Sequence, residues 1–176
     1  MNIKKLLILR LFFIFGLSFV THNIYEWIPS FTTSVFFPVN ESIWEHQKMI
    51  FTTTLIWGII EYIILKRNKM NCKNVISSVS LSAIFNIIIF LIIYTPIYII
   101  FGHNLIITLI IYFITIALAS LVEYVVLSKE KHLTKLNVFA LIIILFIYIL
   151  FGILTYYPLK IESLFYDRRH GVYGLE

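Results

Sequence analysis

The chain has 176 residues, of which 60% are hydrophobic and 13% are charged. Soluble proteins carry about 25% charged residues, so this composition excludes an ordinary soluble domain. The formal net charge of +5 does not indicate nucleic-acid binding, because the Lys and Arg residues are spread between apolar stretches along the chain. We expect the lipid bilayer, and no nucleic acid, as the partner.

Five apolar stretches are long enough, or nearly so, for the roughly 20 residues that a membrane-spanning helix needs. The predicted fold class is therefore an all-α integral membrane bundle of five transmembrane helices, in a single domain over residues 1–176. Arg10 interrupts the first stretch, and we expect its side chain to extend back to the lipid headgroups. No small-residue cleavage site follows, which favours an uncleaved anchor over a cleaved signal peptide. The predicted spans are 4–27, 49–65, 75–101, 105–127 and 137–157.

The basic residues predict the orientation of these helices. Ten of the fourteen Lys and Arg residues lie at the first end of the chain or in the second and fourth connections. By the positive-inside rule this side is cytoplasmic, which places the N-terminus inside and the C-terminus outside. The loop 28–48 and the tail 158–176 then lie on the outer face. The single cysteine, Cys72, falls in a cytoplasmic connection, where it can form no intrachain disulfide and is expected to be an unmodified thiol.

The loop that precedes the second span carries a dense polar motif. We expect Asn40 to cap a helix that starts at Glu41 and continues into the span. Glu41 and Glu45 would then lie one turn apart, with Lys48 on the same face as a charge partner. Trp44 is expected to anchor this helix at the headgroup level. Capping and anchoring leave one pair of neighbours in this motif without an explanation, namely Glu45 and His46.

Further histidines and carboxylates map to the same outer face. Such residues from separate segments can assemble a divalent-metal or acid–base site, although none has a diagnostic metal-ligand spacing. The alternative is that they are solvated loop residues. The tail 164–174 mixes aromatic and charged residues with glycine, which favours a folded lid over this face or an aromatic strip in the interface. The predicted polar site consists of His22, Asn40, Glu41, Trp44, Glu45, His46, His103 and Asp167, with Glu45, His46 and His103 as candidate metal ligands and Glu45, His46 and Asp167 as candidate catalytic residues.

A second polar layer lies inside the spans. Glu61 and Glu123 each fall about one turn inside a predicted cytoplasmic helix end, and we expect them to reach Lys66 and Lys129. The similarity of the segments around the two glutamates, 58–66 and 120–129, indicates either a duplicated helix pair or a coincidence of Ile-rich sequence. The third span adds a polar stripe, which predicts helix–helix hydrogen bonds or, together with the glutamates, a proton or cation path. That stripe is Ser78, Ser82 and Asn86.

Two segments resemble a known family. They are Pro38-Val39-Asn40-Glu41-Ser42-Ile43-Trp44-Glu45-His46 with Lys48, and Leu164-Phe165-Tyr166-Asp167 followed by Gly171-x-Tyr173-Gly174. The chain is similar over essentially its whole length to a family of small bacterial membrane proteins that is catalogued as a domain of unknown function. The resemblance implies a multi-pass protein of the bacterial cytoplasmic membrane, and it supplies no activity, substrate or cofactor. It also implies that the stretch containing His170 is a variable part of the tail.

Three functions are compatible with these features. The first is a non-enzymatic protein, either a small carrier or an accessory subunit that binds a membrane protein or a second copy of itself. The second is a hydrolase or transferase for lipid or lipid-linked substrates at the outer leaflet. In it Glu45 is the general base or a ligand, His46 and His103 are ligands or acid–base groups, and Asp167 is the orienting group. The third is a haem protein with two axial ligands chosen from His22, His46 and His103. We favour the first because no catalytic spacing is diagnostic; convergence of His46 with His22, His103 and Asp167 would favour the enzyme.

Overall fold

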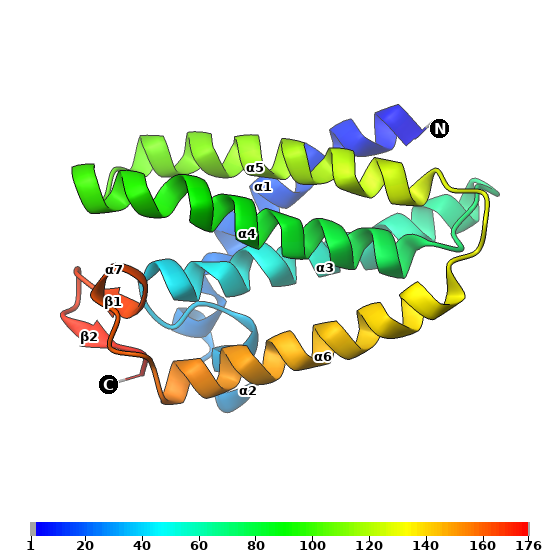
Figure 1. The fold of residues 1–176 in the computed structure, drawn as a ribbon. Helices are drawn as coiled ribbons and strands as arrows, with labels where there is room; N and C mark the ends of the chain where they lie inside the picture. Colours follow the sequence, from blue (N-terminus) through cyan, green and yellow to red (C-terminus); the bar gives the residue numbers. More distant parts are fainter. Residues whose placement is uncertain (1–2, 176) are drawn as a thin grey trace.

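The structure, a computed structural model, describes residues 3–175, and this part of the chain is almost entirely helical (Figure 1). The prediction of an all-α chain is therefore confirmed. A two-residue antiparallel ribbon in the tail, which the sequence did not predict, pairs Tyr166 with Tyr173. The elements are α1 (Ile3–Trp27), α2 (Phe31–Phe36), α3 (Ile43–Arg67), α4 (Val75–Phe101), α5 (Leu105–Leu127), α6 (Thr134–Tyr156), α7 (Glu162–Phe165), β1 (Tyr166–Asp167) and β2 (Val172–Tyr173).

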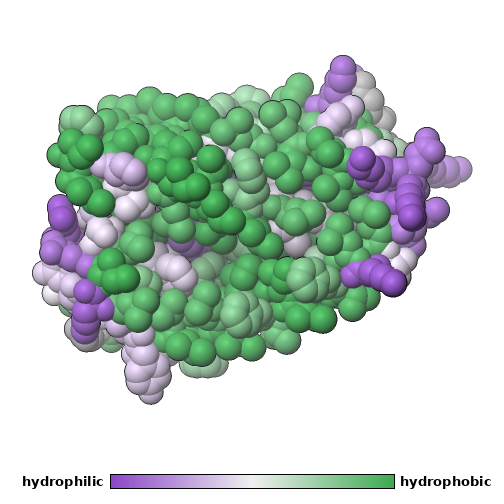
Figure 2. Space-filling model, in the orientation of Figure 1, coloured by the Kyte–Doolittle hydropathy of each residue, from purple (hydrophilic) through white to green (hydrophobic). Residues whose placement is uncertain are grey.

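Four helices of the described chain are long and apolar enough to cross a membrane, namely α3, α4, α5 and α6. In Figure 2 an apolar belt covers the sides of the molecule and polar residues gather at its two ends. These features support a multi-pass membrane protein, because a long helix with apolar residues on its outer face requires lipid or protein around it. That α1 forms a fifth span stays a prediction.

The two ends of the bundle differ in character (Figures 1 and 2). One end carries the connections 68–74 and 128–133 together with the start of α1, and we call it the basic end. The other carries the loop 28–42, the hairpin turn 102–104 and the tail 157–175, and we call it the tail end. The described chain thus begins at the basic end and finishes at the tail end, as the predicted topology requires.

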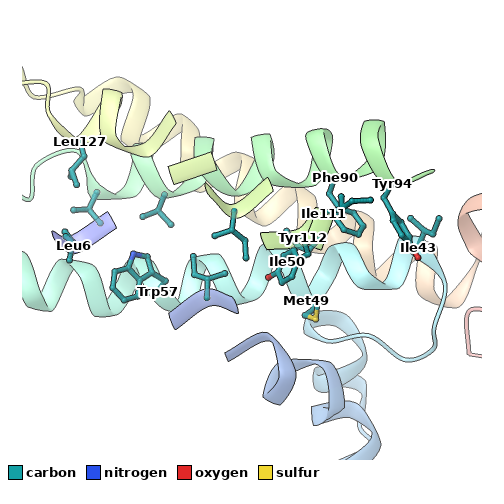
Figure 3. Close-up of a cluster of buried hydrophobic side chains, with 14 of the residues drawn as sticks. Leu6, Ile43, Met49, Ile50, Trp57, Phe90, Tyr94, Ile111, Tyr112 and Leu127 are labelled. Atoms are coloured by element: carbon teal, nitrogen blue, oxygen red, sulfur yellow. The ribbon is translucent and has the colours of Figure 1, made fainter. Parts of the chain in front are cut away.

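Helix α3 lies at the centre of the bundle. Of its most apolar 18-residue window 61% is buried within the protein, against 33% or less for α4, α5 and α6. It packs against α1 on one side and α4 on the other, while α5 closes the group by contacting both α1 and α4. The approach to α4 is close at Gly58, where an added Cβ would lie 2.7 Å from Val79 Cγ1. Figure 3 shows Trp57 in the middle of the resulting core, between Leu6 and Tyr112.

The start of α3 differs from the prediction. The helix begins at Ile43, and its cap is Ser42, whose Oγ accepts a hydrogen bond from the backbone N–H of Glu45 at 3.3 Å. Asn40 is therefore not the cap; its side chain accepts from Ser42 N at 2.9 Å and donates to the carbonyl of Gly174 at 2.8 Å. Glu41 consequently lies in a loop, so it does not share a helical face with Glu45. The loop also contains helix α2, which the sequence did not predict.

The tail folds back onto the start of α3. Phe165 is buried, and its ring stacks on that of Trp44 with centroids 5.0 Å apart. Trp44 also meets the edge of Phe151 of α6. The indole is thus packed between α3, α6 and α7, and it does not serve as the membrane-facing anchor that the sequence predicts. Of the two possibilities for the tail, the folded lid is the one observed.

Candidate metal site at the tail end

Three side chains from separate segments converge at the tail end. His22 comes from the last turns of α1, Glu41 from the loop before α3, and His46 from the first turn of α3. The Nε2 atoms of the two imidazoles lie 3.2 Å apart, and each lies 3.6 Å from Glu41 Oε2. Atoms with these separations can all lie about 2.0–2.1 Å from one ion, which is the ligand distance of Zn²⁺. We call these three residues the His–Glu triad.

The imidazole of His46 is held in a single tautomer. Its Nδ1 lies 2.8 Å from the backbone carbonyl oxygen of Ser42, so Nδ1–H donates and Nε2 keeps its lone pair toward the triad centre. A backbone carbonyl on the distal ring nitrogen is the usual support of a metal-binding histidine. The capped first turn of α3 therefore presents His46 in the form that binds a metal.

The carboxylate of Glu41 is held in its ionised form. A hydrogen bond from His22 is the main cause that lowers the pKa of Glu41 to about 2, and the charge of Arg169 acts in the same direction. Arg169 Nη1 lies 3.5 Å from Glu41 Oε1. The backbone N–H of Glu41 donates to Asp167 Oδ2 at 2.9 Å, which fixes the loop against the tail. Two neutral imidazoles and one carboxylate form a donor set that suits Zn²⁺.

A cavity of about 390 Å³ opens beside the triad. His22, Glu41 and His46 form part of its wall, and His103 also lines it from the turn between α4 and α5. Three protein ligands facing a cavity leave a fourth position for water or a substrate, as in catalytic rather than structural zinc sites. The rest of the wall is mainly apolar and includes Phe19, Met49, Phe90, Leu105, Leu109 and Tyr112.

Glu45 has a different environment from the triad. Its Oε2 lies 2.5 Å from Lys48 Nζ, and it also accepts the backbone N–H of Val39 at 3.1 Å. Its Oε1 accepts the hydroxyl of Thr155 at 3.0 Å, while Lys48 donates to the carbonyl of Ser34 at 2.6 Å. Both charged side chains are fully buried. Glu45 and Lys48 therefore tie α2, α3 and α6 together, and Glu45 is not part of the His–Glu triad.

Asp167 holds the tail in place. Burial raises the pKa of Asp167, but hydrogen bonds from Glu41 N, His170 Nδ1 and the N–H groups of Arg169 and His170 together outweigh burial and lower it. His170 Nδ1 lies 2.7 Å from Asp167 Oδ2. With its oxygens engaged in this way, Asp167 supports Glu41 through the backbone. It does not orient either histidine of the triad.

The glutamates of the second polar layer and Arg10 do not extend to the membrane surface, contrary to the predictions for them. Arg10, Glu61 and Glu123 have no exposed surface. Arg10 Nε lies 2.9 Å from Glu123 Oε2, and its two terminal nitrogens donate to Ser120 at 2.5 Å and Ser82 at 2.6 Å. The attraction between Arg10 and Glu123 offsets part of the cost of removing both charges from water.

The three residues of the polar stripe on α4 have different hydrogen-bond partners. Ser82 joins the Arg10 cluster and also donates to the carbonyl of Ala119 at 2.8 Å. Ser78 donates to the carbonyl of Val75 within its own helix. Asn86 is fully buried, and no described residue is a hydrogen-bond partner of its amide. Only Ser82 therefore forms the side-chain contacts between helices that the stripe predicts.

Sequence reasoning placed His22, Glu41 and His46 on one face but put Glu41 in the first turn of the helix, where the structure has a loop. It missed Arg10 as a partner of the glutamates. The available signal was that Arg10, Glu61 and Glu123 carry opposite charges at similar depths from one side of the membrane. The duplicated helix pair stays a prediction.

Comparison with known proteins assigns a family but no activity. No curated protein and no solved structure matches this chain. The model of the Family of unknown function (DUF6512) matches residues 1–175, which is almost the whole chain. The chain therefore belongs to the DUF6512 family.

Proposed function

We propose that this protein is a five-span protein of the bacterial cytoplasmic membrane that binds one divalent transition-metal ion, of which Zn²⁺ fits best, at the outer face. In this topology α1 is the fifth span, the basic end is cytoplasmic and the tail end is extracytoplasmic. The observation that carries the proposal is the convergence of His22, Glu41 and His46 at 3.2–3.6 Å from three separate segments. The first candidate function is non-enzymatic, either a metal-binding carrier or a metal-binding accessory protein.

A metal-dependent hydrolase is the second candidate, and the cavity favours it. An ion held by the triad would carry water at its open position and lower the pKa of that water toward 7. The apolar wall beside it suits the acyl part of a lipid or lipid-linked substrate. Arg169, at the rim with its guanidinium toward Glu41, would favour an anionic headgroup. In this function His46 and His22 bind the ion, and His103 lies beside the substrate.

The triad does not suit a haem with two histidine ligands. Axial ligands lie on opposite faces of the porphyrin, whereas the Nε2 atoms of His22 and His46 are in hydrogen-bond contact at 3.2 Å. No porphyrin plane can be placed between atoms that close.

Metal analysis of purified protein tests the proposal. We expect one Zn²⁺ per chain in plasma emission analysis and calorimetric titration, and a loss of at least tenfold in affinity in each of His22→Ala, Glu41→Gln and His46→Ala. His132→Ala, at the basic end, is the matched control and should bind like the wild type. Absence of stoichiometric Zn²⁺ binding, or equal binding by His46→Ala and His132→Ala, would overturn it.

The hydrolase candidate has its own measurement. Zn²⁺-loaded protein is incubated with vesicles of phospholipid, and the products are separated by mass spectrometry. Turnover that disappears in His46→Ala and persists in His132→Ala supports the enzyme. Zinc binding without turnover leaves the non-enzymatic function as the one supported.

A further inference from the structure

The charges of the Arg10 cluster require a bound proton. Arginine stays protonated in proteins, so Arg10 contributes one positive charge. Glu61 and Glu123 face it from α3 and α5, while α4 contributes only the hydroxyl of Ser82. Both oxygens of the Glu61 carboxyl group are buried, and no described residue is a hydrogen-bond partner of either. Two carboxylates and one guanidinium leave this fully buried cluster with one negative charge in excess, and one proton on a carboxyl group makes it neutral.

An apolar layer separates this cluster from the basic end. Leu6 lies one turn before Arg10 on α1, Leu65 one turn after Glu61 on α3, and Leu127 one turn after Glu123 on α5. Residues four apart share a helix face, so all three leucines cover the cluster on the same side. Each is at most 2% exposed, and they belong to one packed core (Figure 3).

Toward the tail end the neighbours of the cluster include the apolar residues Ile14 and Ala119, and also buried polar groups without partners. Trp57 lies one turn from Glu61 on α3, and Asn86 lies one turn from Ser82 on α4. The indole N–H, both amide atoms of Asn86 and the hydroxyl of Tyr112 are buried, and no described residue hydrogen-bonds to them. Buried polar groups are normally satisfied, and ordered water is the usual partner where the protein supplies none.

These groups lead to the cavity beside the His–Glu triad. Tyr112 and Ser18 line that cavity, and Figure 3 places Tyr112 on the far side of Trp57 from Leu6. Along α1 the distance from Arg10 to His22 is twelve residues, or about 18 Å at 1.5 Å per residue. A short file of water between Asn86, Trp57 and Tyr112 would therefore connect the cluster to the tail end, whereas the leucines close it toward the basic end.

We propose that Glu61 and Glu123 form a proton-binding site inside the membrane, loaded from the cavity at the tail end. A hydronium ion in the cavity gives up a proton and becomes water; the proton passes along the polar groups and binds a carboxylate oxygen of Glu61 or Glu123. Arg10 compensates the remaining negative charge. This site does not depend on metal binding at the triad.

Infrared spectroscopy of the protein in nanodiscs tests the site. The wild type is expected to show the C=O band of a protonated carboxylic acid at neutral pH, and the band should shift when H₂O is replaced by D₂O. The band should be lost in Glu61→Gln and Glu123→Gln and kept in Glu26→Gln, which alters an exposed glutamate. A band that is absent at neutral pH, or unchanged in both buried variants, overturns the site. Circular dichroism checks the fold, and the wild-type band alone is decisive if a variant does not fold.

The rate of the D₂O shift tests the route. Asn86→Leu removes a polar group on the tail side of the cluster and should slow the exchange at least tenfold. Ser78→Ala, on the same stripe but toward the basic end, removes a hydroxyl that bonds only within its own helix among the described residues, and the exchange rate should not change. Equal exchange rates in the two variants, or faster exchange in Asn86→Leu, overturn loading from the tail end.

Discussion

Glu45 and His46 are neighbours on α3, yet their side chains belong to two separate clusters. The carboxylate of Glu45 lies 2.5 Å from Lys48 Nζ in the protein interior, whereas His46 Nε2 lies 3.2 Å from His22 Nε2 at the edge of a cavity. One cluster holds the helices together, and the other presents lone pairs and a carboxylate to an open position. Substitutions at these two positions should therefore have different effects.

Removal of Lys48 should destabilise the fold. Lys48→Met leaves the Glu45 carboxylate buried without its charge partner, and breaking such a pair costs about 3–5 kcal/mol. Chemical denaturation in detergent, followed by circular dichroism, measures the loss. The exposed pair between Arg168 and Glu162 is the control, and Arg168→Gln should change stability by less than about 1 kcal/mol. Similar stabilities of the two variants would contradict a structural role for the Glu45–Lys48 pair.

Zinc affinity should fall in mild acid. Both histidines must be neutral to bind the ion, and imidazole gains a proton near pH 6.5. Glu41 does not contribute in this range, because its pKa lies at about 2 and the carboxylate stays ionised. Calorimetric titration should show little change above about pH 7.5 and a decrease of up to roughly a hundredfold per pH unit below about pH 6, since two protons compete with each ion. An affinity that is constant down to pH 4 would contradict ligation by the histidines.

Gly174→Ala should release the tail. Gly174 has a φ of +63°, and an added Cβ would overlap the carbonyl oxygen of Thr155. The left-handed conformation alone costs a residue with a Cβ about 1–2 kcal/mol. Trypsin cleavage after Arg168 and Arg169 should become faster, because the tail would leave its position more often. Gly16→Ala is the control, since nothing lies within 4 Å of an added Cβ there. Equal cleavage rates would show that the tail does not depend on this close approach.

The native cysteine can report the topology. Cys72 lies between α3 and α4 at the basic end, which the proposed orientation places in the cytoplasm. A membrane-impermeant maleimide should label it only after cells are permeabilised. In the Cys72→Ser background, Glu26→Cys at the tail end should be labelled in intact cells. The reverse pattern would contradict the proposed orientation.

The helices could be predicted from the sequence because their signal is local. The length of each apolar run predicts a membrane-spanning helix, and the observed bounds of α4 and α5 coincide with the predicted ranges. The start of α3 was less accurate, since both Asn40 and Ser42 can cap a helix and only the tail contact of Asn40 decides between them. That contact joins residues 134 positions apart, so no local pattern contains it.

The candidate sites, too, could be predicted only as far as local sequence signals reach. The polar residues of the tail end could be gathered on one face from topology alone, and His22, Glu41 and His46 are among them. Which of the carboxylates faces the histidines depends on the packing of α2 and α6 against Glu45, which the sequence does not reveal. Arg10 was assigned to the membrane surface because a lone arginine near a helix end usually extends there. Its partners lie on helices whose neighbours could not be deduced.

The buried position of Arg10 has a consequence for biosynthesis. An arginine within an isolated membrane helix opposes insertion by about 2.5–3.5 kcal/mol at the helix centre. Its countercharges, Glu61 and Glu123, leave the ribosome only after α1 has been made, and the serine that contacts it on α5 is also late. In the proposed five-span topology, helix α1 is therefore expected to wait at the membrane surface, or in contact with the insertion machinery, until α3 and α5 have been made. If α1 is the fifth span, a chain truncated before α5 should lack a stably inserted first helix, because Ser120 and Glu123 would be missing.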